Sequence, residues 1–305
     1  MEHTAAWRTK VIISFAAVYI IWGSTYLAIR VGVQQLPPAL FAGVRFVIAG
    51  ILLALYARHR GQNFPKQIHE WRTIAISAFL MLVAANGLVV WGEQWVPSNQ
   101  AALIVATTAL WLAGFGVLGP QGHRLGARTI LGLAIGFFGA AMLLLPDRGF
   151  TLKHFWAQVG ILAACPLWAA GSMYAKHCQL TTPPLMIAAM QSLVAGIILG
   201  VFGIAGGETA RWSWSVEAMA ALLYLIVFGS CFAYAAYIWL LHEVSPAALG
   251  TYAYINPLVA VVLGWLVLDE TLSAEQMAGT VVILIGVLIV SIARPKALAA
   301  PSQRT

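Results

Sequence analysis

The chain has 305 residues, of which 61% are hydrophobic and only 9% are charged, with a formal net charge of +7. Soluble domains usually contain about 25% charged residues, so this composition excludes an ordinary water-soluble enzyme and predicts that lipid surrounds much of the chain. The basic residues lie in loops between apolar runs, which argues for the lipid bilayer as a partner and against nucleic acid.

Ten apolar stretches are candidates for membrane-crossing helices, because one crossing needs about 20 mostly apolar residues. Proline pairs begin two of them, and a proline in the first turn of a helix loses no hydrogen bond. The sequence therefore predicts an all-α integral membrane fold with short loops. In chain order the predicted helices are residues 11–33, 38–57, 72–92, 97–118, 128–146, 156–176, 184–205, 216–241, 246–268 and 275–293.

The second half of the chain repeats the first at an offset of 146 to 148 residues. Pro37 and Pro38 match Pro183 and Pro184, and Trp91 and Val96 match Trp239 and Val244. The expected domains are thus a five-helix repeat over 11–146 and a second over 156–293. An odd number of crossings inserts the second repeat upside down, and two inverted repeats are a common layout of transporters.

The distribution of Lys and Arg predicts the orientation, because cytoplasmic loops carry an excess of both. With both termini in the cytoplasm, twelve such residues fall on the inner side and three on the outer side, so we expect both termini to be cytoplasmic. The inner residues are Arg8, Lys10, Arg58, Arg60, Lys66, Arg72, Arg124, Arg128, Lys176, Arg294, Lys296 and Arg304, and the outer ones are Arg148, Lys153 and Arg211.

Several local motifs resemble those of EamA-type drug/metabolite transporters over roughly residues 11–293. They are WGSTYLAIR at 22–30, AGVRF at 42–46, VSPAALGTYAYINP at 244–257, VAVVLG at 259–264 and DETL at 269–272. The resemblance implies ten helices in two inverted EamA units, a bacterial inner membrane location and a small-molecule substrate. The family includes YddG-type exporters of aromatic and other amino acids. One departure is Ala109, at the position matching Pro257, which leaves open whether the fourth helix breaks there.

Arg45 has the highest expected free-energy cost of membrane insertion in the chain. It lies about two turns inside the second predicted helix, roughly 10 Å along its axis. One interpretation is a structural arginine whose charged end reaches toward the membrane surface. The other is that Arg45 faces a cavity and attracts the carboxylate of a substrate. Its counterpart in the second repeat is the neutral Gln191.

Aromatic residues near mid-membrane form a second group of candidates. A buried Tyr hydroxyl or Trp N–H needs a hydrogen-bond partner, and lipid offers none. Each residue alone is as well explained by helix packing, whereas the set suits a pocket for an aromatic or amphipathic solute. The candidates are Trp22, Tyr26, Trp111, Trp168, Tyr234, Tyr237 and Tyr252.

Asn86 and Asn256 complete the candidate substrate-binding residues. Each amide either binds solute or joins helices by a hydrogen bond, which is typically worth about 0.6 kcal/mol in membranes. Pro257 also frees the carbonyl of Ala253 for a polar contact. The glycines of 132–139 recur at 279 and 286, so the fifth and tenth helices are expected to pack against each other or against another subunit, which leaves a homodimer open.

No Asp or Glu falls at mid-membrane, because the acidic residues lie at predicted helix ends: Glu93, Glu243, Asp269, Glu270 and Glu275. This weakens obligatory proton exchange without excluding it. The sequence shows neither a Walker loop nor a metal-ligand cluster, and its three cysteines show no metal spacing, so we expect no cofactor, no metal and no enzymatic activity.

Taken together, the sequence predicts an inner-membrane carrier that exports small metabolites, amino acids including aromatic ones among them, by alternating access, either facilitated or proton-linked. The alternative is an exporter of drugs or other lipophilic or cationic solutes. That alternative usually calls for an anionic group in the cavity, which the sequence does not place there.

Overall fold

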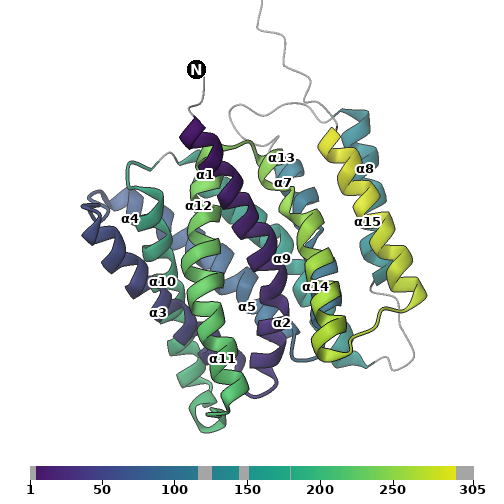
Figure 1. Cartoon of the computed structure of the whole chain (residues 1–305), viewed down its shortest axis with the longest axis horizontal. Helices are drawn as coiled ribbons and strands as arrows, with labels where there is room; N and C mark the ends of the chain where they lie inside the picture. Colours follow the sequence, from purple (N-terminus) through teal and green to yellow (C-terminus); the bar gives the residue numbers. More distant parts are fainter. Residues whose placement is uncertain (1–4, 116–125, 144–150, 179, 293–305) are drawn as a thin grey trace, which may run out of the picture.

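The computed structural model describes residues 5–115, 126–143, 151–178 and 180–292, and all secondary structure within them is helical, as expected (Figure 1). Five of the basic residues used to predict the orientation lie outside the described residues: Arg124, Arg148, Arg294, Lys296 and Arg304.

The first half of the chain forms five helical segments in the order of the predicted stretches. Their bounds are α1 Ala5–Ala16, η1 Ala17–Ile21 and α2 Trp22–Val33; α3 Pro38–His59; α4 Ile68–Ala78, η2 Phe79–Asn86 and α5 Gly87–Gly92; α6 Ser98–Val105 and α7 Thr108–Phe115; and α8 Ala127–Leu143. The segments η1 and η2 are π-helical turns within otherwise continuous α-helices.

The second half repeats this order. Its elements are α9 Leu152–His177; α10 Pro184–Ala205, followed by the 3-10 turn η3 Glu208–Arg211; α11 Val216–Tyr224, the π-helical η4 Leu225–Ala233 and α12 Tyr234–Glu243; α13 Pro246–Leu249 and α14 Tyr252–Leu268; and α15 Ala274–Ile292. The π-helical segments η2 and η4 occupy matching positions of the two halves, and such turns are frequent at functional sites.

Within the described residues, six helical stretches are long and apolar enough to cross a membrane. They are Ala5–Val33, Pro38–His59, Ile68–Gly92, Leu152–His177, Pro184–Ala205 and Val216–Glu243. Shorter apolar helices cover Ala127–Met142, Ile255–Leu268 and Ala274–Val290. These lengths and compositions agree with the membrane fold that the sequence predicts.

The fourth predicted helix breaks although it has Ala109, and not proline, at the position that matches Pro257. It divides into α6 and α7 at Ala106 and Thr107, whereas Pro257 lies inside the continuous α14. The corresponding break in the second half comes earlier, at Gly250 and Thr251. At both breaks a threonine hydroxyl donates to the carbonyl three residues back, 2.8 Å from Thr107 and 2.6 Å from Thr251. Side-chain bonds of this kind compete with the backbone ladder.

Two helix pairs pack through glycines, and each joins one half of the chain to the other. A Cβ on Gly43 of α3 would lie 2.6 Å from the backbone nitrogen of Gly200 in α10. A Cβ on Gly139 of α8 would lie 2.6 Å from the backbone nitrogen of Ile283 in α15. Figure 1 shows α8 and α15 side by side at one edge of the bundle. This confirms that the fifth and tenth predicted helices pack against each other.

Two buried carboxylates also connect the halves. Glu70, at the start of α4, accepts hydrogen bonds from the backbone nitrogens of Thr181 (2.9 Å) and Thr182 (3.0 Å), just before α10. Glu208, in η3, accepts one from the backbone nitrogen of Leu40 in the first turn of α3 (2.8 Å). Each carboxylate satisfies N–H groups that a helix start leaves without a partner.

Candidate functional site

A cavity lies between helices of both halves of the chain. Pockets for small molecules usually have mostly apolar walls and a few polar groups, as this one does. Residues of α2, α3, η2, α5, α6, α7, α9, η4, α12 and α14 line it: Trp22, Thr25, Tyr26, Ile29, Arg45, Phe46, Leu82, Ala85, Asn86, Val89, Val105, Thr108, Ala164, Cys165, Trp168, Gly229, Tyr234 and Tyr252.

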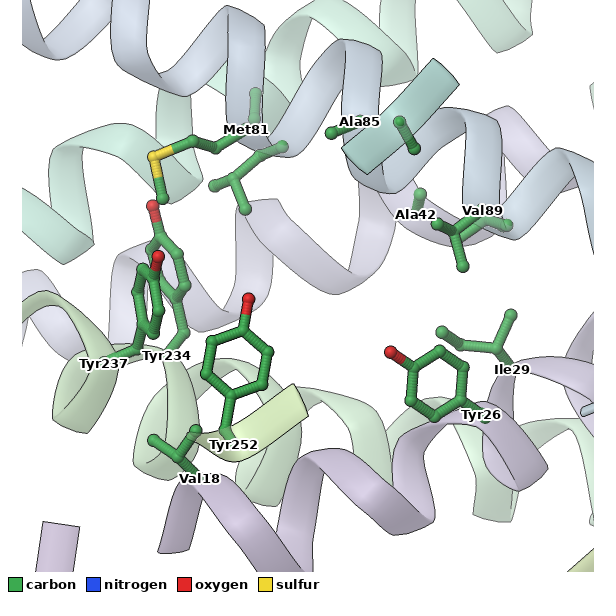
Figure 2. Close-up of a cluster of buried hydrophobic side chains, with 14 of the residues drawn as sticks. Val18, Tyr26, Ile29, Ala42, Met81, Ala85, Val89, Tyr234, Tyr237 and Tyr252 are labelled. Carbon is green, nitrogen blue, oxygen red and sulfur yellow. The ribbon is translucent and has the colours of Figure 1, made fainter. Parts of the chain in front are cut away.

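Seven of the residues singled out from the sequence line this cavity, namely Trp22, Tyr26, Arg45, Asn86, Trp168, Tyr234 and Tyr252. Figure 2 shows the hydroxyl groups of Tyr26 and Tyr252 pointing into the space between their helices and Ala85. The other three, Trp111, Tyr237 and Asn256, do not line it.

Aromatic rings from both halves of the chain form one wall of the cavity. Trp22 meets Trp168 edge to face at 5.4 Å between ring centroids and Tyr252 at 5.6 Å. The indole nitrogen of Trp22 donates to the carbonyl of Gly229 in η4, at 3.2 Å. The indole is thus held by a backbone group of the π-helical turn, and its ring also packs against Tyr237 at 4.9 Å between centroids.

Tyr237 lies behind this wall and holds it in place. Its hydroxyl accepts a hydrogen bond from the indole nitrogen of Trp168 (3.0 Å) and shares another with the hydroxyl of Ser172 (2.7 Å). The side chain has no exposed surface. The prediction that Tyr237 needs a polar partner was right, but the partner is a neighbouring side chain of the wall.

We expect Tyr237→Phe to raise the KM for solute about 3- to 10-fold and to change kcat little. The variant keeps the ring but removes the hydroxyl that fixes Trp168, a neutral hydrogen bond worth about 0.5–1.5 kcal/mol. Initial transport rates at several solute concentrations in proteoliposomes measure both constants. Tyr56→Phe, on the exposed side of α3, is the control, and equal KM values in both variants would contradict the positioning role.

The guanidinium group of Arg45 lines the cavity with part of its hydrogen-bonding capacity unused. The residue is 4% exposed, and its Nε donates to the hydroxyl of Ser230 in η4, at 2.8 Å. Its Nη1 has no hydrogen-bond partner among the described residues, and none of them brings a carboxylate within ion-pair distance. A buried cation is normally paired, so this guanidinium retains the capacity to bind an anionic group.

Two further polar atoms in the lining are unsatisfied. The side-chain oxygen of Asn86, at the end of η2, and the hydroxyl of Thr108, at the start of α7, find no hydrogen-bond partner in the described part of the chain. Both are buried atoms, and leaving such groups unpaired is costly. The cavity therefore offers one cation, one acceptor and one hydroxyl to a solute that supplies the complementary groups.

The counterpart of Arg45 in the second half plays a supporting role. Gln191, which matches Arg45, accepts a hydrogen bond from the hydroxyl of Tyr234 (2.7 Å) and donates to Ser77 (2.7 Å). Gln191 thereby holds Tyr234 in the lining, although it does not reach the cavity itself.

Asn256 and Trp111 serve packing between helices. The amide orientation that satisfies Asn256 has its nitrogen donate to the carbonyl of Tyr19 in η1, at 3.0 Å. Asn256 therefore joins α14 to the π-helical turn of the first helix. The ring of Trp111 packs against Phe137 of α8, at 5.0 Å between centroids.

Sequence reasoning did not single out Phe46, Cys165 and Gly229 as lining residues. Gly229 matters because a Cβ there would lie 3.2 Å from Nη2 of Arg45. Its position within a long apolar helix was the available signal, since an isolated glycine often marks a close approach. Among the described residues no group of His, Cys, Asp or Glu side chains is arranged to hold a metal ion.

Comparison with known proteins places the chain in a family. The model of the EamA-like transporter family matches twice, at residues 9–145 and 155–292. The uncharacterized inner membrane transporter YedA of Escherichia coli (strain K12) is 39% identical over 91% of this chain and 89% of its own. Protein PagO of Salmonella typhimurium is 26% identical over 94% of both chains.

One solved crystal structure shares the fold, with a TM-score of 0.68 over 92% of this chain and 97% of the other at 18% sequence identity. The apolar spans and these relatives make the chain a multi-pass protein of a bacterial inner membrane. It belongs to the EamA-like transporter family, and it is a membrane transporter.

Proposed function

We propose that this transporter exports amino acids, aromatic ones among them, through the central cavity. The observation that carries the proposal is the set of unsatisfied polar atoms in an aromatic-walled cavity: Nη1 of Arg45, the side-chain oxygen of Asn86 and the hydroxyl of Thr108. A zwitterionic amino acid supplies the groups that these atoms lack.

The complementarity is specific in charge. The substrate carboxylate binds Arg45, because guanidinium and carboxylate form strong charge-assisted hydrogen bonds. The substrate ammonium donates to Asn86 and Thr108, which accept but carry no charge. An aromatic side chain then packs against Trp22, Trp168 or Tyr252.

The transport cycle that we propose uses ten crossings in two inverted halves with both termini in the cytoplasm, and the cavity opens alternately to each side. The double match to the family model and the matching positions of η2 and η4 support two equivalent halves. Hinge motion is expected at the breaks beside Thr107 and Thr251, where the backbone ladder is already interrupted.

An exporter of drugs or other lipophilic cations is the alternative function. The aromatic wall would suit such solutes through cation–π contacts. Against it, the described lining contains Arg45 and no carboxylate, so an organic cation would meet a like charge in a buried site.

Proteoliposomes containing the purified protein test the proposal. We expect saturable efflux of labelled L-phenylalanine, with competition by other neutral amino acids and weaker competition by phenethylamine, which lacks the carboxylate. Movement of phenethylamine but not of phenylalanine would favour the alternative, and movement of no amino acid would reject the proposed substrate class.

A further inference from the structure

Glu93 is a buried acid that the transport site does not use. It directly follows the span Ile68–Gly92 and ends α5, with none of its surface exposed. Neither of its carboxyl oxygens has a hydrogen-bond partner within the described residues. The sequence placed it correctly at a helix end, but it did not reveal this burial.

Glu70 provides the contrast within the same molecule. It is equally buried, at 1% exposure, but its carboxylate accepts four hydrogen bonds, from the backbone of Lys66, Thr181 and Thr182 and from the hydroxyl of Thr181. Donors of this kind stabilise the ionised form. Glu93 receives none, so burial at this point favours the neutral acid.

Charged and titratable groups lie near Glu93 on several elements, but none of the described ones donates a hydrogen bond to its carboxyl oxygens. Arg30 of α2 donates to the backbone carbonyl of Glu93, and Glu270 caps the start of α6 through Ser98. His154 of α9 contacts the carbonyl of Trp95 at 3.2 Å. Tyr26 of α2 and Arg45 of α3 also interact electrostatically with the Glu93 carboxyl.

Burial raises the pKa of the Glu93 carboxyl well above its ordinary value, while the charges of Arg30 and Arg45 oppose the shift. Opening this end of the bundle would hydrate the carboxyl, remove the cost of burial and favour ionisation. Burial in the closed form therefore favours the protonated carboxyl more strongly than hydration in an open form would.

Glu93 is also connected to the cavity. Val89, one turn earlier on the same helix face, lines the cavity together with Tyr26 and Ile29, and Figure 2 shows these three side chains gathered at one end of it. Arg45, the proposed partner of the substrate carboxylate, both lines the cavity and interacts with the charge of Glu93.

We propose that Glu93 is a proton-binding site that holds a proton while this end of the cavity is closed and releases it to water when that end opens. The O–H bond of the carboxyl breaks, the proton passes to water or buffer, and the carboxylate remains on the protein. The charged form then competes for Arg45 and displaces the substrate carboxylate. This link to transport rests on the proposed function.

On closure a proton returns from the same side, so the cycle moves no net proton through this site. The equilibrium between closed and open forms changes at most about tenfold per pH unit, because one proton is bound or released. The pH on the side where α5 ends, and not a pH gradient, is expected to control opening.

Infrared spectroscopy tests the protonation without any substrate. We expect wild-type protein at neutral pH to show the C=O stretch of a protonated carboxyl, and Glu93→Gln to lack that band. Glu70→Gln is the matched control and should leave the band in place. Absence of a protonated-carboxyl band from the wild type, or its persistence in Glu93→Gln, would overturn the proposal; the wild-type measurement needs no variant to fold.

Hydrogen exchange of residues 87–97 tests the link to opening. After correction for the chemical exchange rate, exchange should rise with pH in the wild type and stay constant in Glu93→Gln, and equal pH dependence in both proteins would overturn the link. Amino-acid efflux from wild-type proteoliposomes is the separate readout for the proposed function. Its absence, alongside the expected infrared result, would reject the substrate and leave the proton site standing.

Discussion

Arg45→Gln is expected to lower kcat/KM for phenylalanine export roughly 10- to 150-fold. A hydrogen bond to a charged group contributes about 1.5–3 kcal/mol, and each 1.4 kcal/mol corresponds to a factor of ten. Glutamine is the residue at the matching position of the second half, Gln191, where it is fully buried. The substitution therefore removes the charge and introduces the side chain that the matching position of the second half carries.

A substrate comparison makes this experiment specific. The wild type should prefer phenylalanine over phenethylamine, and Arg45→Gln should lose that preference, because both solutes then meet a neutral side chain. Arg211→Gln is the matched control, since the Arg211 side chain is 63% exposed and pairs with Glu208 at the surface. An Arg45→Gln carrier that still discriminates between the two solutes would remove Arg45 from the carboxylate site.

Gly196→Ala is expected to lower the stability of the transporter by about 1–3 kcal/mol, the usual cost of forcing an extra carbon into a packed interior. The new Cβ would lie 2.5 Å from the backbone nitrogen of Val47 in α3. Backbone cannot rotate away as a side chain can, so α3 and α10 must separate. Arg45 and Phe46 belong to the displaced part of α3, and transport should fall as well.

Gly200→Ala gives the matched control for this prediction. Gly200 lies one turn further along α10, and a Cβ there meets no atom within 4 Å. The thermal unfolding midpoint in detergent, measured for both variants, separates close packing from the general effect of replacing glycine in a helix. Equal midpoints for Gly196→Ala and Gly200→Ala would contradict the tight contact between the two helices.

Much of the fold follows from the sequence because the bilayer imposes simple rules of length and polarity. The predicted helices 38–57 and 184–205 correspond to Pro38–His59 and Pro184–Ala205, each with proline in the first turn. The breaks were less predictable. Proline was the expected cause, whereas Thr107 and Thr251 interrupt the backbone through their hydroxyl groups, and most threonines in helices do not.

For the candidate site, the sequence could predict only which polar side chains need a hydrogen-bond or charge partner. Arg45 and Trp22 were found because lipid satisfies neither group. The same criterion selected Tyr237 and Asn256, whose partners turned out to be Trp168 and a backbone carbonyl of η1. Hydropathy cannot tell whether the missing partner is protein or solute, since that depends on packing between helices distant in sequence.

Glu93 illustrates the same limit from the other direction. A carboxyl group at a helix end ordinarily reaches water, and the sequence offered no reason to expect otherwise. Glu270, which is distant in sequence from Glu93, lies close enough to interact with it electrostatically and accepts a hydrogen bond from Ser98. Burial of this kind is a property of the assembled bundle.

The interlocked pairing of α3 with α10 has a consequence for biogenesis. The backbone N–H of Leu40 obtains its hydrogen-bond partner only when Glu208 has been synthesised. Gly43 likewise obtains its packing partner, Gly200, only when α10 is in place. We therefore expect the first five helices to leave the ribosome as an incomplete structure that waits in the bilayer for the second half. The family model matches each half separately, but we expect the whole chain to be the unit of folding.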